Sequence, residues 1–562
     1  MKIFFIAMTF FLCLQHTVMA KAWFVATNGS DANPGTETRP FKTLPTAITA
    51  ANAGDTINLR GGQYTSQEIR IDKSRLTIRS YPGEWAVITA PTNIEDIASC
   101  IWYNDPEVSG GSLERLEIVG GYYYGVSFET NWDWGLPQRR GVSNIVLREC
   151  MVHHTGRDCI KIKPACDNIQ ILHCELFASG KGISNLPENG GPNAEAIDNV
   201  NGDGMIVRNC HIHHISTTGV YVKGGAQNAL VEENLIYETG EAGILLGFYT
   251  DAEFFDQDGT NPKYFECRNS VARNNIVHTT GGAGIGFFAA DNCAAYHNTV
   301  VTASSVFHAP LYFSPGDIWI SDRLSLTPPN VNIQVYNNIF VDQSGPGEDN
   351  FTVQIRAGGL SGNNLINHNI YFKPVGAAQF DDGVSWPSLS FQQWKAQMGF
   401  DAASQTLNPG LKEDFHLAAG SPAIDAGRES PATRDYDLGP RSGLRDVGAD
   451  EINNASPLEV PPPGGVIGTF SGSMISAVPV LTSIDAGFSV FPNPASRLIN
   501  VSGNGPIIKG LYLFNSLGQE VRTSSGTTMR VSDLPPGLYQ LVIRTAENYA
   551  VSRVILATGD QE

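Results

Sequence analysis

The chain has 562 residues, a formal net charge of −19 and 58 glycines, and only 17% of its residues are charged. Frequent Gly, with many Asn, is typical of turn-rich β structure rather than of a helix bundle. The acidic charge disfavours nucleic acid as a partner, because phosphate binding needs a basic surface. A protein this acidic that binds an acidic polymer must gather its Lys and Arg locally or use a bound cation.

The N-terminus has the features of a removable secretory signal peptide at 1–20. Lys2 provides the positive start, 3–14 is apolar, and Ala20 ends a small-residue cleavage site. An uncleaved anchor is the alternative. The apolar stretch is too short to span a membrane, and no later run reaches the roughly 18 apolar residues of a span, so we expect no transmembrane segment.

A repeat of alternating apolar residues around one Cys or Asn runs through the middle of the chain. Three of its intervals are 24, 24 and 23 residues, and single insertions explain the longer ones. A unit of this size with period-2 alternation buries its apolar face only by stacking on its neighbours. The pattern predicts a parallel β-helix, with the Asn side chains stacked along the axis in left-handed turns and the Cys as small buried residues. A Cys150–Cys174 disulfide is the alternative. The repeated positions are Cys150, Cys174, Cys210, Asn234, Asn275, Asn298, Asn338 and Asn369.

Thirteen residues after two of these positions come Lys163 and Lys223, each at the end of the third strand of a coil. If the apolar residues of these strands point inward, the polar ones between them point outward. Long insertions at 130–141, 186–203, 248–266 and 314–330 are expected to follow the third strand and to form a wall beside one face. The residues expected to point outward are Lys161, Lys163, Tyr221, Lys223 and Glu129.

The ends of the β-helix need closure. Residues 42–52 have helical apolar spacing and predict an N-terminal cap, and 415–427 with 437–451 are expected to close the far end. Residues 452–484 are a linker rich in Pro, Gly and Ser. Beyond them, 485–562 shows short alternating strands typical of a small β-sandwich.

Two resemblances cover most of the chain. The segment 23–64 and the repeats after it look like secreted pectate-lyase-like right-handed parallel β-helix proteins, which implies this fold over 21–451. The segments VFPNPASRLINV, LYLFNSLGQEV and LPPGLYQLVI of 490–543 closely resemble the C-terminal sorting domain of the type IX secretion system. That resemblance implies export to the medium or the outer-membrane surface of a Gram-negative bacterium, with the secretion machinery as a partner.

A third, partial resemblance concerns chemistry. Residues 221–248 are similar to a segment of the chondroitinase-B and alginate-lyase family in which a third-strand Lys is the base, and Lys223 occupies that position. The family's Arg in the next coil is replaced here by Leu246-Gly247, and its acidic calcium ligands by Ser216 and Thr218. The sequence therefore shares the family's Lys but lacks its Arg and its metal ligands at the matching positions.

The sequence therefore predicts a polysaccharide lyase acting on a uronate polymer. Lys223 is the expected base, Lys163 a helper, and Tyr221 or His214 the proton donor. The expected metal ligands, for Ca²⁺, are Asp198 and Asp203, although solvated acidic loops and surface Lys are the alternative reading of these charges. The residues expected to bind substrate are Glu129, Lys161, Trp132, Trp134 and Tyr249.

Two other functions stay open. The acidic residues of 186–203 and 248–266 could supply the paired carboxylates of a glycoside hydrolase. A non-catalytic polysaccharide-binding protein or adhesin has the same fold. We expect a monomer in each case.

Overall fold

In the computed structural model, the described residues are 20–132, 139–321, 324–343, 350–452, 488–491, 495, 497–503, 508–514, 520–534, 537–545 and 549–556. All but Ala20 of the expected signal peptide, all but one residue of the linker, and Trp134 lie outside them. The chain divides into two compact units, Met1–Ile467 and Gly468–Glu562. None of the described helices is long and apolar enough to cross a membrane.

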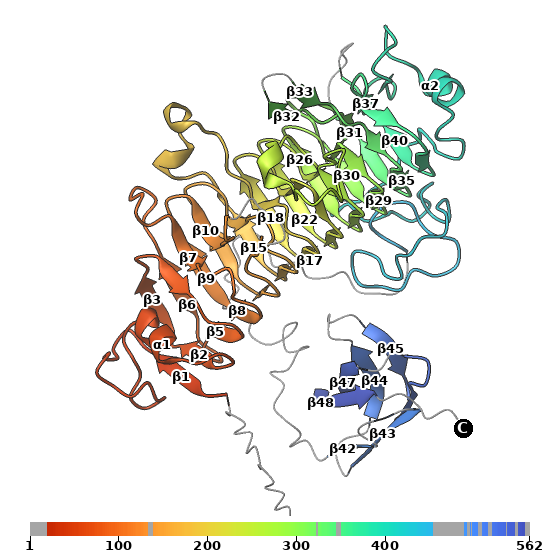
Figure 1. The fold of residues 1–562 in the computed structure, drawn as a ribbon. Helices are drawn as coiled ribbons and strands as arrows, with labels where there is room; N and C mark the ends of the chain where they lie inside the picture. Colours follow the sequence, from red (N-terminus) through yellow and green to blue (C-terminus); the bar gives the residue numbers. More distant parts are fainter. Residues whose placement is uncertain are drawn as a thin grey trace, which may run out of the picture. The chain divides into compact units, whose positions relative to one another are not determined.

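The first unit is a right-handed parallel β-helix, which confirms the fold predicted from the repeat (Figure 1). Each coil passes through three long parallel sheets in turn, and every strand pairs with the strand of the next coil. The strands of the first sheet are β1 (Ala22–Val25), β2 (Thr56–Leu59), β5 (Leu76–Ser80), β8 (Gly111–Glu114), β11 (Val146–Arg148), β14 (Gln170–Leu172), β17 (Ile206–Arg208), β21 (Leu230–Glu232), β25 (Val271–Arg273), β29 (Ala294–Tyr296), β35 (Gln334–Tyr336) and β39 (Leu365–Asn367).

The second and third sheets continue the same coils. The second sheet comprises β3 (Gly62–Thr65), β6 (Ala86–Thr89), β9 (Leu116–Val119), β12 (Met151–His153), β15 (Glu175–Phe177), β18 (His211–Ile215), β22 (Leu235–Thr239), β26 (Ile276–Thr280), β30 (Thr299–Val301), β36 (Ile339–Val341) and β40 (Ile370–Phe372). The third sheet comprises β4 (Ile69–Ile71), β7 (Ser99–Tyr103), β10 (Tyr124–Phe128), β13 (Ile160–Ile162), β16 (Ile197–Val200), β19 (Val220–Lys223), β23 (Ile244–Leu246), β27 (Ile285–Phe288), β31 (Leu311–Ser314), β37 (Val353–Ile355) and β41 (Phe380–Asp381).

Shorter elements join these sheets. A narrow parallel sheet follows the third sheet in the later coils, and one antiparallel hairpin and three short 3₁₀ helices lie in the insertions. They are β20 (Ala226–Gln227), β24 (Cys267–Arg268), β28 (Ala290–Asp291), β34 (Asn330–Val331) and β38 (Leu360–Ser361), the hairpin β32 (Ile318–Ser321) and β33 (Leu324–Leu326), and η1 (Ile183–Asn185), η2 (Pro187–Asn189) and η3 (Ala252–Phe254).

The core of the β-helix is a continuous apolar column. In the first sheet, Leu147, Ile171 and Val207 are in register in successive coils and are fully buried. Each such side chain contributes about 1.5–3 kcal/mol by leaving water. The stacking therefore gives every coil the buried face that it cannot form alone.

The repeated Cys and Asn positions form one line along the axis, as predicted. Asn275 Oδ1 accepts hydrogen bonds from Asn234 N (3.1 Å) and Asn234 Nδ2 (2.9 Å), and Asn298 and Asn338 continue this ladder. The eight described cysteines are buried and free, so no Cys150–Cys174 disulfide is formed. The expected left-handed turn was misplaced by one residue: positive φ falls on the preceding residue, as at Asn274 (51°) and Glu233 (59°).

The two ends are closed differently from each other. Helix α1 (Leu44–Ala50) buries Leu44, Ala47 and Ile48 at the N-terminal end, as predicted. The far end is closed by α2 (Phe391–Met398), whose Trp394 is fully buried in the column. The expectation that 415–427 and 437–451 close this end is wrong, because these segments pack on the outer face of the second sheet. Leu417 clusters there with Ile339 and Ile370, and Ala449 N donates to Thr299 Oγ1 at 3.0 Å.

One insertion was also misplaced. Residues 197–200 form β16 of the third sheet, so the added residues of that coil precede the third strand instead of following it. The other insertions follow the third strand, and residues of 130–141 and of 186–203 contact 248–266. Arg139 donates to Phe254 O (3.0 Å) and lies 3.6 Å from Asp256, and Asn201 Nδ2 donates to Phe254 O at 2.8 Å.

The second unit has a small core of its own between two antiparallel sheets. Ile499 and Val501 of one sheet and Leu511, Leu541 and Ile543 of the other are buried together. This arrangement agrees with the predicted small β-sandwich. Its strands are β42 (Phe488–Phe491), β43 (Leu498–Gly503) and β46 (Thr528–Arg530) in one sheet, and β45 (Glu520–Ser524), β44 (Ile508–Phe514), β47 (Gly537–Thr545) and β48 (Tyr549–Leu556) in the other.

Candidate functional site

The outer face of the third sheet gathers charged residues from three successive coils. Lys161, Asp198 and Tyr221 are in register on β13, β16 and β19, and they alternate with inward residues such as Ile160 and Val220. Lys223 ends β19, and Lys163 follows β13 two coils earlier. The repeat predicts this separation of two coils between Lys163 and Lys223, and the stacking of the strands is sufficient to produce it.

Asp198 binds two of these lysines. Lys223 Nζ lies 3.2 Å from Asp198 Oδ1, and Lys161 Nζ binds Asp198 Oδ2. Burial raises the pKa of Asp198, but the two ammonium groups outweigh burial and lower it overall. Burial lowers the pKa of Lys161, but the attraction of Asp198 and its neighbours raises it overall. Asp198 is therefore ionised, and Lys161 is a fixed cation.

Two further carboxylates lie beside Asp198. Asp158, Glu195 and Asp198 are buried, and each offers one oxygen within 4.8 Å of the others. Thr217 Oγ1 donates to Glu195 Oε1 at 2.9 Å, whereas Glu195 Oε2 has no hydrogen-bond partner within the described part of the chain. Burial and the charge of Glu195 raise the pKa of Asp158 well above its usual range. Hard cations such as Ca²⁺ bind groups of carboxylates whose negative charges the protein does not fully neutralise.

Lys163 does not join this cluster. Its ammonium lies 2.7 Å from Glu129 Oε2, which also accepts from Trp102 Nε1 at 3.1 Å. The Trp132 ring, 44% exposed, lies 5.5 Å from Lys163 Nζ. Glu129, Lys163 and Trp132 therefore form a neighbouring group with an exposed aromatic surface.

The aromatic residues around Lys223 differ in exposure. Lys223 Nζ lies 4.3 Å from the centre of the Tyr221 ring, but Tyr221 is buried beneath Phe248. Burial raises the pKa of the Tyr221 hydroxyl well above its usual range, so it stays protonated. Tyr249 is 47% exposed, and its hydroxyl lies 3.2 Å from Ser314 Oγ.

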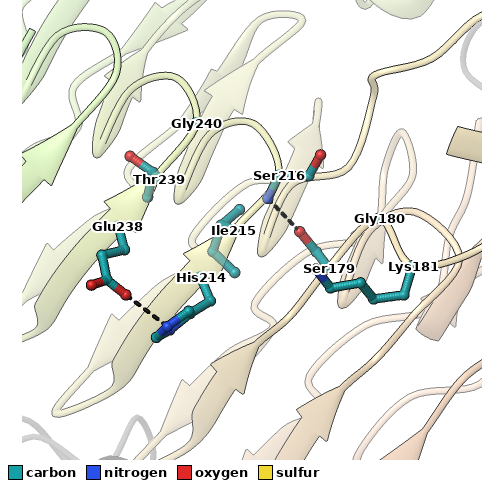
Figure 2. Close-up of a pocket in the computed structure, with 9 residues that line it drawn as sticks. All are labelled: Ser179, Gly180, Lys181, His214, Ile215, Ser216, Glu238, Thr239 and Gly240. Atoms are coloured by element: carbon teal, nitrogen blue, oxygen red, sulfur yellow. Dashed lines mark hydrogen bonds and ion pairs between the residues drawn. The ribbon is translucent and has the colours of Figure 1, made fainter. Parts of the chain in front are cut away.

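The structure does not bring His214 to Lys223. His214 belongs to β18 of the second sheet and pairs with Glu238 Oε2 at 2.8 Å. The two residues line an open pocket of about 560 Å³. Figure 2 shows the pair on one side of it and Ser179 and Lys181 on the other. Asp203 is likewise outside the carboxylate cluster, because its side chain accepts from Gln227 N (3.0 Å) and Gln227 Nε2 (2.8 Å).

Sequence reasoning missed Asp158 and Glu266. Asp158 and Glu195 each stand two residues before an inward isoleucine that is in register, Ile160 and Ile197, so aligning the coils on these isoleucines would have found the pair. Glu266 is fully buried and accepts from Gly224 N (2.7 Å), Thr250 N (2.8 Å) and Thr250 Oγ1 (2.7 Å). Burial raises its pKa to about 7. Glu266 holds the turn that follows Lys223.

Comparison with known families agrees with this architecture. Residues 23–299 match the family model described as the Pel9A-like, right-handed β-helix region. The β-helix of these residues is therefore similar to the β-helix region of that family. The Pel9A-like region contains Lys161, Lys223 and all three clustered carboxylates. Residues 489–557 match the model of the secretion-system C-terminal sorting domain, which directs a protein to secretion or to attachment at the cell surface in Bacteroidetes.

Two curated proteins share part of the sequence. Pectate lyase PEL9 of Emericella nidulans is 38% identical over 84 residues, which are 14% of this chain and 20% of that protein. The uncharacterized protein YwoF of Bacillus subtilis is 33% identical over 104 residues, 17% of this chain and 22% of that protein. The chain thus spans about a fifth of the length of each.

Among solved structures, the crystal structure of pectate lyase Pel9A matches with a TM-score of 0.43 and 15% identity, over 77% of this chain and 96% of that one. The likeness to this structure is one of fold. By its family-model match, the β-helix is of a carbohydrate-active type related to pectate lyases.

Proposed function

We propose that this protein is a polysaccharide lyase that cleaves a uronate-containing polysaccharide by β-elimination, with Lys223 as the base. One observation carries the proposal: Lys223 lies on the outer face of the third sheet, 3.2 Å from a buried carboxylate that belongs to a cluster of three. A base beside a cation-binding group is the pairing that β-elimination on a uronate requires, because the proton at C5 becomes acidic only when the enolate is stabilised.

Asp158, Glu195 and Asp198 would hold a divalent cation, for which Ca²⁺ is the best fit. The three carboxylates would supply part of the six to eight oxygens that Ca²⁺ takes, and water and the substrate carboxylate would supply the rest. Glu195 Oε2 has no hydrogen-bond partner among the described residues, and the raised pKa of Asp158 marks a crowded carboxylate; both support the fit. A bound Ca²⁺ would supply the positive charge that the substrate carboxylate needs.

In its neutral amine form, after its own proton has been lost to solvent, Lys223 would remove the C5 proton and become the ammonium that Asp198 binds. Its position is held from two sides, by Asp198 and by the Glu266 hydrogen bond to Gly224 N. Of the two proposed proton donors for the leaving oxygen, Tyr221 is next to Lys223, whereas His214 is on another sheet. Lys163, Lys161 and Glu129 would position uronate groups in the neighbouring coils. Trp132, Trp134 and Tyr249 would stack on sugar rings.

The test is product analysis of the purified full chain with polygalacturonate and a panel of other uronate polymers, with and without Ca²⁺. A lyase forms an unsaturated, ultraviolet-absorbing end with each cleavage. Lys223→Ala and Lys223→Arg should lose about 10²-fold or more in kcat, and the exposed Lys42→Ala at the N-terminal cap should match wild type. Binding without any cleavage would overturn the proposal.

A glycoside hydrolase is the second candidate, and the carboxylate cluster favours it. Two carboxyl groups about 5–5.5 Å apart serve retaining hydrolases, and oxygens of Asp158, Glu195 and Asp198 lie within 4.8 Å of one another. New reducing ends without ultraviolet absorbance, together with near-wild-type turnover in both Lys223 variants, would favour the hydrolase.

A further inference from the structure

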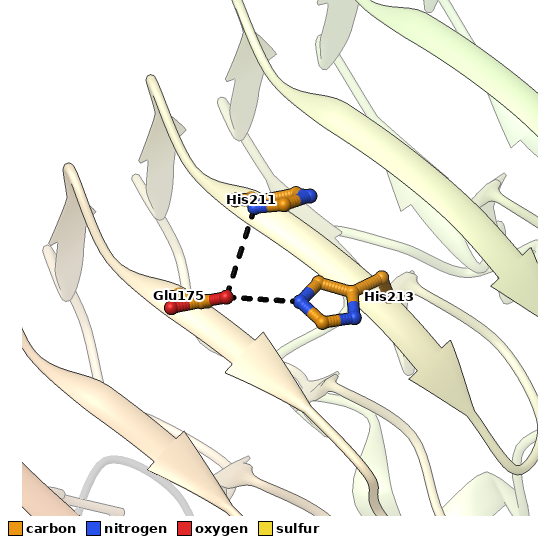
Figure 3. Close-up of side chains that lie close together, drawn as sticks. All are labelled: Glu175, His211 and His213. Carbon is orange, nitrogen blue, oxygen red and sulfur yellow. Dashed lines mark hydrogen bonds and ion pairs between the residues drawn. The ribbon is translucent and has the colours of Figure 1, made fainter. Parts of the chain in front are cut away.

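A second cluster of ligand-type side chains lies on a different sheet from the proposed site. Glu175 is on β15 of the second sheet, and His211 and His213 are on β18 in the next coil (Figure 3). Glu175 is in register with His211, and Phe177 with His213. The inward residues between them, Leu176 and Ile212, direct these three side chains to the outer face of the sheet.

The three side chains converge on one point. His213 Nε2 lies 3.1 Å from Glu175 Oε1, and His211 Nδ1 lies 3.8 Å from the same oxygen. All three ligand atoms lie within 4.8 Å of one another, and the residues are between 0% and 4% exposed. Glu175 Oε2 makes no hydrogen bond within the described part of the chain. A buried carboxylate with one oxygen unsatisfied is costly unless a cation binds it.

We propose that Glu175, His211 and His213 bind Zn²⁺ and thereby cross-link two successive coils. Two imidazoles and one carboxylate suit Zn²⁺, whereas Ca²⁺ and Mg²⁺ prefer oxygen ligands throughout. The outer nitrogens of both rings are already oriented. His211 Nε2 lies 3.1 Å from Tyr237 Oη, and His213 Nδ1 lies 2.7 Å from His214 Nδ1. Such contacts set the tautomer and ring angle of metal-binding histidines.

The preceding coils provide a natural comparison. His153 Nε2 lies 3.2 Å from Glu117 Oε1, which repeats the pair of His213 with Glu175. The position in register with Glu117 is Met151, where the site has His211 in register with Glu175. The two places therefore differ by one imidazole. A plain ion pair needs only the shared Glu and His, and a zinc site needs the second His as well.

The experiment is calorimetric titration of the chelator-treated full chain with Zn²⁺, in excess Ca²⁺ so that the carboxylate cluster of the third sheet is occupied. Wild type should bind one Zn²⁺ tightly and melt at a higher temperature with it. His211→Met, which copies the preceding coil, should weaken binding by more than about 100-fold, since even the loss of an outer contact to a ligand costs about 10–100-fold. His153→Ala removes an equivalent His from outside the cluster and should bind as wild type does.

Met151→His tests the inference in the other direction. It places a second imidazole opposite Glu117 and should create a second Zn²⁺ site, which decides the matter even if His211→Met does not fold. Absence of binding by folded wild type, or unchanged stoichiometry and affinity in His211→Met, would overturn the inference. Neither result depends on cleavage of a polysaccharide, so this site and the proposed lyase activity stand or fall separately.

Discussion

Lys223 and Asp198 lie on neighbouring strands of the third sheet, with Lys223 Nζ 3.2 Å from Asp198 Oδ1. Asp198 also binds Lys161, so one buried carboxylate holds two ammonium groups from the coils on either side of it. The arrangement fixes the position of Lys223 without covering it on all sides. It also makes Asp198 the residue through which the proposed base and the proposed cation site are coupled.

Asp198→Asn should lower both activity and stability. Removing one member of a buried ion pair costs about 3–5 kcal/mol, because it leaves the partner charges uncompensated. We expect a lower denaturation midpoint and a large loss of kcat, measured by denaturant unfolding and by product formation. Asp258→Asn is the control and should match wild type, because Asp258 lies in an exposed loop and accepts hydrogen bonds from the neighbouring Thr260. Equal stability of the two variants would contradict the structural role of Asp198.

Removal of Ca²⁺ should abolish turnover. A calcium chelator is expected to stop cleavage, and added Ca²⁺ to restore it, because the three carboxylates then regain their cation. Glu195→Gln keeps the shape of the side chain but removes one charge, so it should raise the Ca²⁺ concentration needed for half-maximal activity. If turnover is unchanged in the presence of the chelator, the reaction does not need a cation at the carboxylate cluster.

The Asn ladder should be a major source of stability. Asn298 Oδ1 accepts from Asn275 N and Nδ2, and Asn298 Nδ2 donates to Ala272 O. Asn298→Ala removes these hydrogen bonds, and a buried group that loses its partner costs about 1–3 kcal/mol. The free energy of unfolding should fall accordingly, whereas the exposed Asn363→Ala should change it little. A loss no larger than that of the control would mean that water replaces the ladder.

Stability should fall in alkaline solution because of His416. Burial lowers the pKa of this imidazole, but its hydrogen bond to Asp437 and the nearby carboxylates outweigh burial and raise the pKa to about 9. The folded state thus binds the proton more tightly than the unfolded chain, whose His has a pKa near about 6.5. The contribution of protonated His416 to the free energy of unfolding is complete below about pH 6.5 and is lost as the pH rises through about 9. His416→Gln should flatten the dependence of the melting temperature on pH over this range.

The sorting domain should be dispensable for catalysis. It forms a separate compact unit with its own core. Deleting 468–562 should leave kcat of the purified β-helix unchanged and should abolish export from the producing cell. Loss of turnover by a folded, truncated protein would show that the second unit takes part in the reaction.

Much of the fold could be predicted because the repeat carries it. The period of 23–24 residues and the alternation within it determine which side chains enter the column, so the axial line from Cys150 to Asn369 and the two-coil separation of Lys163 and Lys223 follow from the sequence. The one-residue error at the turns has a simple cause. The residue with positive φ is not the stacked Asn, and the pattern marks only the stacked position.

The candidate site was only half visible in the same pattern. The length of an insertion does not show at which residue the next strand begins. Residues 186–203 were therefore predicted to be one loop, although Asp198 belongs to β16 and Glu195 precedes it. His214 was one of two predicted proton donors for the reaction at Lys223, but it lies on β18 of the second sheet, and a turn separates it from Lys223 on β19 of the third sheet.

The sequence by itself determined the β-helix, its register and the outward direction of Lys223, because period-2 strands must bury one face. Only the tertiary structure decided which charges meet. Asp158, Glu195 and Asp198 come from two coils, and Glu175 meets His211 and His213 only because β15 and β18 stack. Such contacts depend on distances between strands that are far apart in the chain, which no local spacing encodes.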